Sequence, residues 1–236
     1  MEQQKQKTHI SIIIPVYNEK NTIAEVIEKV KDADVGHLKK EIIIVDDGSS
    51  DGTKEILRKI NNAKVFFHEK NKGKGAAIRT GLQHANGSFI LIQDADMEYN
   101  PKHYKALLAP LVSGKEQVVY GSRFSKGRFF NKNMYYSHWL GNIALTSITN
   151  MLYGTRINDM ETGYKVMNRD ILEGITLHSD NFDIEPELTA KILKKGIKIE
   201  EIPIDFHPRS FEEGKKINWK HGISALWTLI KYRIRE

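Results

Sequence analysis

The sequence predicts an α/β fold, a three-layer arrangement in which helices cover both faces of a mainly parallel central sheet. Three observations support this prediction. Apolar runs of strand length, rich in β-branched residues, alternate with segments of helical periodicity through the first half of the 236 residues. Most positions within the runs are apolar, as expected for strands that are buried on both faces. Several runs end in a cluster of polar, turn-forming residues.

The elements follow from these patterns in chain order. Strands are predicted at residues 10–16, 41–45, 64–68, 88–93 and 118–121. Helices are predicted between them, over residues 22–31, 52–61, 73–85 and 101–112. Asn21 is expected to cap the first helix, and Pro101 to open the fourth. Either Ser50 or Asp51 would cap the second helix.

The second half of the chain is less regular. Residues 133–155 carry no formal charge, but polar side chains interrupt them and would be costly in hydrocarbon, so an amphipathic helix is expected there. Further elements are a helix over 184–195, a strand over 198–204 and a C-terminal amphipathic helix over 219–233. Because no linker or repeat is visible, residues 8–236 are expected to form a single domain behind a disordered tail, residues 1–7.

Composition limits the cellular compartment and the binding partners that can be expected. The chain has no cysteine, which excludes disulfides and thiolate metal sites and fits a reducing cytoplasm. The first seven residues are polar and lack the apolar segment of a signal peptide, so a cytoplasmic protein is expected. The formal net charge of +6 favours polyanionic partners such as nucleotides, nucleic acids or an anionic lipid surface.

Three polar clusters follow strands of the predicted sheet. They are residues 17–19 after the first strand, 46–49 after the second and 94–96 after the fourth. The carboxyl ends of parallel strands meet at one edge, where α/β folds bind their ligands. The three clusters are therefore expected to line one ligand site.

Asp94 and Asp96 are spaced so that both carboxylates can reach a cation in the loop after the fourth strand. Hard oxygen ligands suit Mg²⁺ or Mn²⁺, and such an ion would bridge the two phosphates of a nucleotide sugar and neutralise the departing nucleoside diphosphate. Glu98 is a candidate third ligand. A solvated acidic turn is the alternative, but the position after a buried strand argues against it.

Two further motifs carry weaker signals. Asp46, at the end of the second strand, would accept hydrogen bonds from a base or a ribose. Residues 71–75 (NKGKG) combine glycines, which let a backbone approach a ligand, with lysines and a following helix N-terminus, which favour anions. A flexible basic turn is the alternative for this loop, and its spacing is not that of a P-loop.

In this order and spacing, four motifs resemble those of family-2 glycosyltransferases, whose GT-A fold is a Rossmann-like three-layer sandwich: residues 14–19 (IPVYNE), 45–53 (VDDGSSDGT), 71–75 (NKGKG) and 94–96 (DAD). Four more resemble the subgroup of dolichyl- and polyprenyl-phosphate mannose or glucose synthases: residues 121–124 (GSRF), 159–165 (DMETGYK), 182–188 (FDIEPEL) and 201–204 (EIPI). The resemblance covers about residues 8–225.

The resemblance implies roles for individual residues. The nucleotide sugar would contact Pro15, Tyr17, Asn18, Glu19, Asp46, Asp47, Lys74 and Asp94. The metal ligands would be Asp94, Asp96 and Glu98. The acceptor phosphate would be held by Arg123, and further cationic candidates for that role are Arg128, Lys132, Arg209 and Lys215.

The resemblance also implies the reaction, an inverting in-line transfer of a hexose from GDP-mannose or UDP-glucose to a polyprenyl phosphate. The acceptor oxygen is then ionised near neutral pH and needs cationic side chains rather than a general base. If the acceptor is instead a glycan or protein hydroxyl, a carboxylate must take its proton. Asp159, with Glu161 behind it, is the candidate, so Arg123 and Asp159 are the expected catalytic residues.

Membrane contact is a further expectation. Residues 121–158 hold five Lys or Arg and no Asp or Glu, and aromatic residues occur both there and in the C-terminal helix. Peripheral contact with lipid at the inner face of the membrane, contact with a membrane partner subunit, and ordinary packing on the core all fit this pattern.

Other functional classes fit less well. A nucleic-acid-binding protein would explain the positive charge, but acidic clusters at the ligand edge repel phosphates unless a cation intervenes. A nucleotidyltransferase would carry a different basic loop near its first strand. An inactive partner subunit that binds nucleotide sugars is compatible with the motifs.

Overall fold

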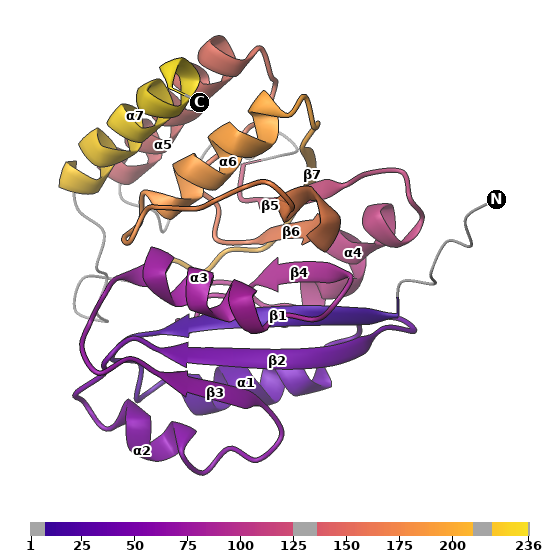
Figure 1. The fold of residues 1–236 in the computed structure, drawn as a ribbon, viewed down its shortest axis with the longest axis vertical. Helices are drawn as coiled ribbons and strands as arrows, with labels where there is room; N and C mark the ends of the chain where they lie inside the picture. Colours follow the sequence, from indigo (N-terminus) through magenta and orange to yellow (C-terminus); the bar gives the residue numbers. More distant parts are fainter. Residues whose placement is uncertain (1–7, 125–135, 210–218, 236) are drawn as a thin grey trace.

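A computed structural model of the chain describes residues 8–124, 136–209 and 219–235 (Figure 1). The tail predicted to be disordered, residues 1–7, lies outside these ranges. Three candidate acceptor-phosphate residues, Arg128, Lys132 and Lys215, also lie outside them.

The described residues form a seven-stranded sheet in the order β3-β2-β1-β4-β6-β5-β7. Its strands are β1 (His9–Val16), β2 (Lys39–Asp46), β3 (Lys64–Phe67), β4 (Phe89–Ile92), β5 (Val118–Ser122), β6 (Lys165–Asn168) and β7 (Glu200–Pro203). Neighbouring strands are parallel, except that β6 runs antiparallel to both β4 and β5. The mainly parallel sheet predicted from the sequence is confirmed.

Sequence reasoning missed β6. Its four residues show neither an apolar run nor an alternation long enough to predict a strand. The strand forms because Val166 and Met167 are buried in the cores on opposite faces of the sheet. Tertiary packing, rather than local preference, decides this element.

Helices lie between the strands and after them. They are α1 (Ile23–Asp32), α2 (Thr53–Leu57), α3 (Lys74–His84), α4 (Tyr104–Val112), α5 (Tyr136–Tyr153), α6 (Ile184–Lys194) and α7 (Trp219–Ile234). Two 3₁₀ turns, η1 (Pro101–His103) and η2 (Arg169–Leu172), precede α4 and follow β6. The second helix is shorter than predicted, because Lys59 and Ile60 bond to carbonyls three residues back and so tighten the last turn.

Two apolar cores hold the three layers together. Ile10, Ile12 and Ile14 of β1 pack in one core with residues of α1 and α4. Ile13 points to the other face and packs with α3 and α6. These helix pairs therefore lie on opposite faces of the sheet (Figure 1).

The C-terminal helix α7 packs against α5 and α6 beyond one end of the sheet (Figure 1). A third cluster of buried residues, which includes Met160, Leu229 and Tyr232, joins them. Among the described helices, none combines the length and the apolar character needed to cross a bilayer.

The predicted cap of α1 is wrong. Thr22, not Asn21, precedes the helix, and its hydroxyl makes no cap bond but donates to the carbonyl of Ala95 at 2.8 Å and to the Glu19 carboxylate at 2.9 Å. At α2 the N-cap residue is Gly52 rather than the predicted Ser50 or Asp51, although Asp51 accepts from the amide of Thr53 at 3.0 Å. Instead of capping the helix, the Thr22 hydroxyl joins the loop after β1 to the loop after β4.

Candidate active site

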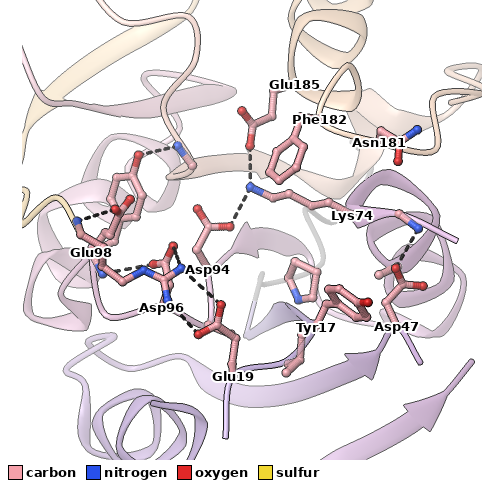
Figure 2. A pocket seen from close by; sticks show the side chains of 18 of the residues that line it. Tyr17, Glu19, Asp47, Lys74, Asp94, Asp96, Glu98, Asn181, Phe182 and Glu185 are labelled. Atoms are coloured by element: carbon pink, nitrogen blue, oxygen red, sulfur yellow. Dashed lines mark hydrogen bonds and ion pairs between the residues drawn. The ribbon is translucent and has the colours of Figure 1, made fainter. Parts of the chain in front are cut away.

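A cavity of about 320 Å³ opens at the edge where the carboxyl ends of β1, β2 and β4 meet (Figure 2). The three polar clusters predicted from the sequence thus converge on one site. Its lining residues include Pro15, Tyr17, Glu19, Asp47, Lys74, Asp94, Asp96, Glu98, Tyr99, Arg123, Glu161, Asn181, Phe182, Glu185 and Arg209.

The lining of the cavity is strongly acidic. Among the described residues, seven carboxylate side chains and three cationic ones line it. The cations are Lys74, Arg123 and Arg209. An anionic ligand would meet net repulsion here unless a further cation accompanied it.

The loops after β1 and β2 are fastened to each other. The amide of Ser50 donates to the side-chain carbonyl of Asn18 at 2.8 Å, and the amide of Asn18 donates to the hydroxyl of Ser49 at 2.9 Å. Asn18 adopts a positive φ of 52°, a conformation that Asn tolerates better than most residues. Asn18, predicted to contact the nucleotide, is therefore a brace that holds Tyr17 at the cavity wall.

Asp46 and Asp47 differ in position. Asp46 is fully buried and does not line the cavity; its Oδ2 accepts from the amide of Ser49 at 3.1 Å, and its Oδ1 has no hydrogen-bond partner among the described residues. Asp47 lines the cavity, but its carboxylate accepts from the amides of Lys72 and Gly73 at 2.9 and 2.7 Å. Asp47 thus fixes the glycine-rich loop.

Amides at the glycine-rich loop that the sequence suggested for a ligand bond to the protein instead. Asp47 takes two of them, and the amide of Ala76 donates to the carbonyl of Asp180 at 3.1 Å. A Cβ atom on Gly73 or Gly75 would overlap the backbone of residues 179–180. The glycines are needed for this close packing of two chain segments.

Lys74 spans the cavity between two carboxylates (Figure 2). Its Nζ lies 2.7 Å from Asp94 Oδ1 and 2.6 Å from Glu185 Oε1. Burial disfavours the charged amine, but the two carboxylates raise the pKa of Lys74 well above its ordinary value. Lys74 is therefore a fixed positive charge beside Asp94.

Arg209 pairs with the carboxylates on the other side of the cavity. Its guanidinium lies 3.1 Å from Asp96 Oδ2 and 2.9 Å from Glu19 Oε2, and its amide donates to Glu98 Oε1 at 2.7 Å. We predicted Arg209 as an acceptor-phosphate residue, but it lies among the residues predicted to bind the donor and the metal. Burial, together with the charges of Asp94 and Glu98, raises the pKa of Asp96 to about 7, and Arg209 opposes this rise.

The three predicted metal ligands are not gathered around one point. Within the described ranges, no group of three His, Asp or Glu side chains has the arrangement of a metal site. Asp94 faces Lys74, Asp96 faces Arg209, and Glu98 accepts from a backbone amide. The chemistry of the donor set nevertheless fits a hard cation, because carboxylate oxygens are the ligands that such ions prefer and carboxylates outnumber cationic side chains in the cavity lining.

Arg123 is held in a fork by Asp159. The side-chain bonds from Nε and the terminal amine measure 2.7 and 2.6 Å, and the amide of Arg123 adds a third at 2.9 Å. Asp159 is fully buried and also accepts from Asn142 at 3.1 Å, whereas Arg123 lines the cavity. In this structure Asp159 positions Arg123 and is not placed to take a proton from a molecule in the cavity.

Glu161 lines the cavity instead of lying behind Asp159. Its Oε1 is shielded from solvent and has no hydrogen-bond partner among the described residues. Burial, followed by the charge of Glu185, raises the pKa of Glu161 to about 7, while Lys165 and Arg123 lower it. We expected Asp159 to face the ligand with Glu161 behind it, but Glu161 lines the cavity and Asp159 does not.

Sequence reasoning assigned no role to Glu185 or Tyr99. Glu185, in the first turn of α6, pairs with Lys74, and the hydroxyl of Tyr99 accepts from the amide of Gly163 at 2.9 Å. The signal for Glu185 was present, because residues 182–188 stood out as a motif. No spacing rule links Lys74 to a helix that begins more than a hundred residues later.

Comparison with known proteins identifies the family. Residues 11–176 match the profile described as Glycosyl transferase family 2, a match over more than half of the chain. The chain belongs to glycosyl transferase family 2. The resemblance inferred from its motifs is confirmed, and the cavity at the carboxyl edge of the sheet is the candidate active site of a family-2 glycosyltransferase.

Three archaeal proteins are similar to this family-2 chain. UDP-N-acetylglucosamine–dolichyl-phosphate N-acetylglucosaminyltransferase of Methanococcus voltae is 29% identical over 95% of this chain and 96% of its own length. Dolichol-phosphate mannosyltransferase of Pyrococcus furiosus is 30% identical over 87% of this chain, and glycosyltransferase AglJ of Haloferax volcanii is 30% identical over 85%. The chain spans only 58% of the Pyrococcus protein and 63% of AglJ.

Solved structures share the fold of this glycosyltransferase. Glucosyl-3-phosphoglycerate synthase from Mycobacterium tuberculosis, crystallised with Mn²⁺, UDP and phosphoglyceric acid, superposes with a TM-score of 0.71 over 96% of this chain and 78% of its own. The two sequences are 22% identical, so the likeness establishes the fold and not the substrate. The predicted GT-A fold is confirmed.

Proposed function

We propose that this family-2 glycosyltransferase moves a hexosyl group from a nucleoside diphosphate sugar to the phosphate of a polyprenyl lipid, with inversion. One observation carries the proposal. A single cavity combines Asp94 and Asp96 with Arg123, whose guanidinium Asp159 holds in a fixed orientation. A diphosphate leaving group and a phosphate acceptor both need fixed positive charge, and such a site supplies it before the substrates arrive.

The donor would occupy the part of the cavity between the β1 loop and Lys74. Pro15 and Tyr17 form an apolar and aromatic wall beside Asp47, which suits a base and a ribose. Lys74 and Arg209 line the same cavity and would meet the phosphates. Each now neutralises carboxylates, so the binding of a donor would exchange one set of ion pairs for another.

Asp94 and Asp96 would hold Mg²⁺ or Mn²⁺. When bound, the ion supplies positive charge to the departing diphosphate. The acidic surplus of the cavity supports this part of the proposal. The Mycobacterium neighbour was crystallised with Mn²⁺ and UDP, which is consistent with it.

The acceptor assignment draws on the relatives. The Methanococcus and Pyrococcus proteins carry dolichyl phosphate or dolichol phosphate in their names. In this chain Arg123 would hold the acceptor phosphate, because its fork to Asp159 leaves it rigid at the cavity wall. Transfer to a glycan or protein hydroxyl is the second candidate, and the position of Glu161 at the cavity favours it, since a hydroxyl needs a proton acceptor.

A surface for lipid contact would accompany such an acceptor. Exposed apolar side chains occur on α5 and α7, namely Leu140, Met151, Ile223, Trp227 and Ile234. Neither helix contains an acidic residue, and α7 ends with Lys231, Arg233 and Arg235 nearby. We therefore propose that this face contacts the inner surface of a membrane, where apolar and basic side chains would bind anionic lipid.

A transfer assay tests the proposed function. The purified chain is incubated with GDP-mannose, UDP-glucose or UDP-N-acetylglucosamine and with either a polyprenyl phosphate or a panel of glycans, in Mg²⁺, Mn²⁺ or EDTA. We expect a lipid-linked sugar from one donor, only when a divalent ion is present. If products form only on glycans, the proposed phosphate acceptor is wrong. If activity is unchanged in EDTA, the proposed requirement for a divalent ion is wrong.

The variant Asp96→Asn tests the metal assignment. It keeps the shape of the side chain but removes one charged oxygen ligand, so we expect donor binding in Mn²⁺, measured by calorimetry, to weaken at least about tenfold. Glu200→Gln, an exposed carboxylate on β7, is the control and should bind as the wild type does. Equal affinities for Asp96→Asn and the wild type would contradict the metal assignment.

A further inference from the structure

His68 directly follows β3 and lies beside the loop that leads to Lys74. Its backbone amide donates to the carbonyl of Asp46 at 2.8 Å, which continues the pairing of β3 with β2 by one residue. Its side chain is 9% exposed and is not among those that line the cavity. A buried imidazole needs a hydrogen-bond partner for each of its two nitrogens, so its neighbours indicate its task.

Both ring nitrogens of His68 have partners. Nδ1 lies 2.7 Å from Oδ1 of Asp47, and Nε2 lies 3.0 Å from the hydroxyl oxygen of Thr80 on α3. Because a carboxylate accepts hydrogen bonds, Nδ1 carries the hydrogen that is donated to Asp47, and Nε2 accepts from the Thr80 hydroxyl. The ring therefore joins the loop after β2 to the middle of α3 in one orientation.

The Asp47 carboxylate transmits this orientation to the glycine-rich loop, residues 71–75. Its Oδ1 accepts from the amide of Lys72 as well as from His68, and its Oδ2 accepts from the amide of Gly73 (Figure 2). Three donors thus fix the two oxygens. Gly73 directly precedes α3, whose first residue is Lys74. The direction in which Lys74 leaves the backbone therefore depends on how the Asp47 carboxylate is turned.

The packing of α3 on the sheet does not need this imidazole. Ala77 and Ile78 of the helix are buried in the core on that face of the sheet. The stacked rings of Phe66 and His84, whose centroids lie 3.9 Å apart, make a further contact between β3 and α3. These contacts remain when His68 is replaced, so the polar bonds of its ring act on the loop rather than on the helix.

We propose that His68 is a positioning residue for donor binding. It holds Asp47 against the loop backbone and so keeps Lys74 directed into the cavity, where Nζ lies 2.7 Å from Asp94 Oδ1. The inference rests on the proposed function, in which Lys74 meets the donor phosphates, and deepens it by adding a residue that does not touch the donor. Without the imidazole N–H, the Asp47 carboxylate would turn toward the cavity that it lines and repel the diphosphate.

Two substitutions separate the hydrogen bond of His68 from its volume. His68→Leu fills the space but donates nothing, whereas the side-chain amide of His68→Asn places an N–H near the position of Nδ1. We expect His68→Leu to raise the KM for the donor at least about tenfold and to change kcat less than about threefold, because a hydrogen bond to a charged group is lost. The KM for the acceptor stays unchanged, and His68→Asn restores most of the donor KM. The matched control is His84→Ala, which removes the neighbouring contact between β3 and α3 and should keep the wild-type values.

A second measurement does not depend on transfer. In NMR experiments, the backbone amides of Lys72 and Gly73 should exchange with solvent at least about tenfold faster in His68→Leu than in the wild type, and at the wild-type rate in His84→Ala. Thr80→Val keeps the imidazole and removes only the partner of Nε2. It should raise both the exchange rates and the donor KM by a smaller factor, and it carries the test if His68→Leu does not fold.

Two results would overturn the inference. One is a donor KM that follows the free energy of unfolding across the variants instead of the presence of an N–H at position 68. The other is unchanged exchange at Lys72 and Gly73 in His68→Leu, or in Thr80→Val where the first variant does not fold. If the wild type binds no nucleotide sugar, the proposed function fails, and amide exchange still decides whether His68 holds the loop.

Discussion

The ionised carboxylate of Glu161, which lines the cavity, lowers the stability of the folded chain. The pKa of Glu161 is raised to about 7 in the folded chain, whereas an unperturbed glutamate titrates near 4.5. The folded state therefore binds more protons than the unfolded state between these two pH values. Stability falls as pH rises through this window, and above pH 7 the folded chain bears the full cost of the buried charge.

Glu161→Gln is expected to stabilise the chain at neutral and alkaline pH. The amide carries no charge to bury, so the free energy of unfolding at pH 8 should rise by on the order of 1–3 kcal/mol relative to the wild type. The two proteins should be nearly equal at pH 4.5, where the wild-type side chain is protonated in the fold. Urea unfolding at both pH values measures the difference, and a variant less stable than the wild type at pH 8 would contradict the assigned environment.

Other residues have structural tasks that their motifs conceal. Asp47 lies within a motif that suggests nucleotide binding, yet its oxygens are taken by the amides of Lys72 and Gly73. Asp159 was expected to act on the acceptor, but its carboxylate accepts hydrogen bonds from Arg123 and Asn142. The motif identifies which residues belong to the site, but hydrogen-bond partners decide what each one does.

At the scale of elements, β6 organises the acceptor side. Because it runs antiparallel between β4 and β5, the loop before it returns to the carboxyl edge of the sheet. That loop carries Glu161 and Gly163, and the amide of Gly163 donates to Tyr99. A Cβ atom on Gly163 would overlap Oδ2 of Asp94, so the glycine sets how closely the loop approaches Asp94, one of the two proposed metal ligands.

Gly163→Ala should therefore impair the site. The added methyl group pushes Asp94 away from its place, and since Lys74 and the backbone hold Asp94, we expect kcat/KM for the donor to fall at least about tenfold. The free energy of unfolding should fall by about 1–3 kcal/mol. Steady-state kinetics and urea unfolding measure the two effects.

Gly141→Ala is the matched control for this change. Gly141 lies in α5, and a Cβ atom added there meets nothing within 4 Å. Alanine favours a helix over glycine by about 1 kcal/mol, so this variant should be active and slightly more stable. Wild-type kinetics for Gly163→Ala would show that Asp94 does not need its present position.

For the whole molecule, the arrangement of layers separates two surfaces. The candidate active-site cavity opens at the carboxyl edge of the sheet, whereas most of the exposed large apolar side chains among the described residues lie on α5 and α7. These two helices pack beyond one end of the sheet (Figure 1). Trp227 is 64% exposed and Ile223 is 59% exposed, four residues apart on α7. Their spacing places both side chains on one face of the helix.

Vesicle flotation tests the proposed lipid contact. The wild type should float with vesicles of phosphatidylcholine and phosphatidylglycerol at low salt and less at high salt, because the basic side chains contribute by charge. Ile223→Ser with Trp227→Ser should weaken binding at least about tenfold. Phe67→Ser is the control, since Phe67 is an exposed aromatic on the distant edge strand β3. Equal flotation of wild type and double variant would remove this surface from the proposal.

The sequence by itself determined the α/β class, the strands with apolar runs and the polar clusters at one edge of the sheet. Periodicity and the rule that parallel strands end at a common edge are local or topological properties, and they can be read without coordinates. The family membership followed from motifs such as residues 94–96, because their order along the chain is itself sequence information.

The tertiary structure alone decided the strand β6, the pairing of Lys74 with Glu185, the place of Arg209 among donor-side carboxylates and the exchange of positions between Asp159 and Glu161. Each depends on segments far apart in the chain. Hydrogen bonds and burial between such segments set where a side chain points and how it titrates, and no local spacing encodes either property.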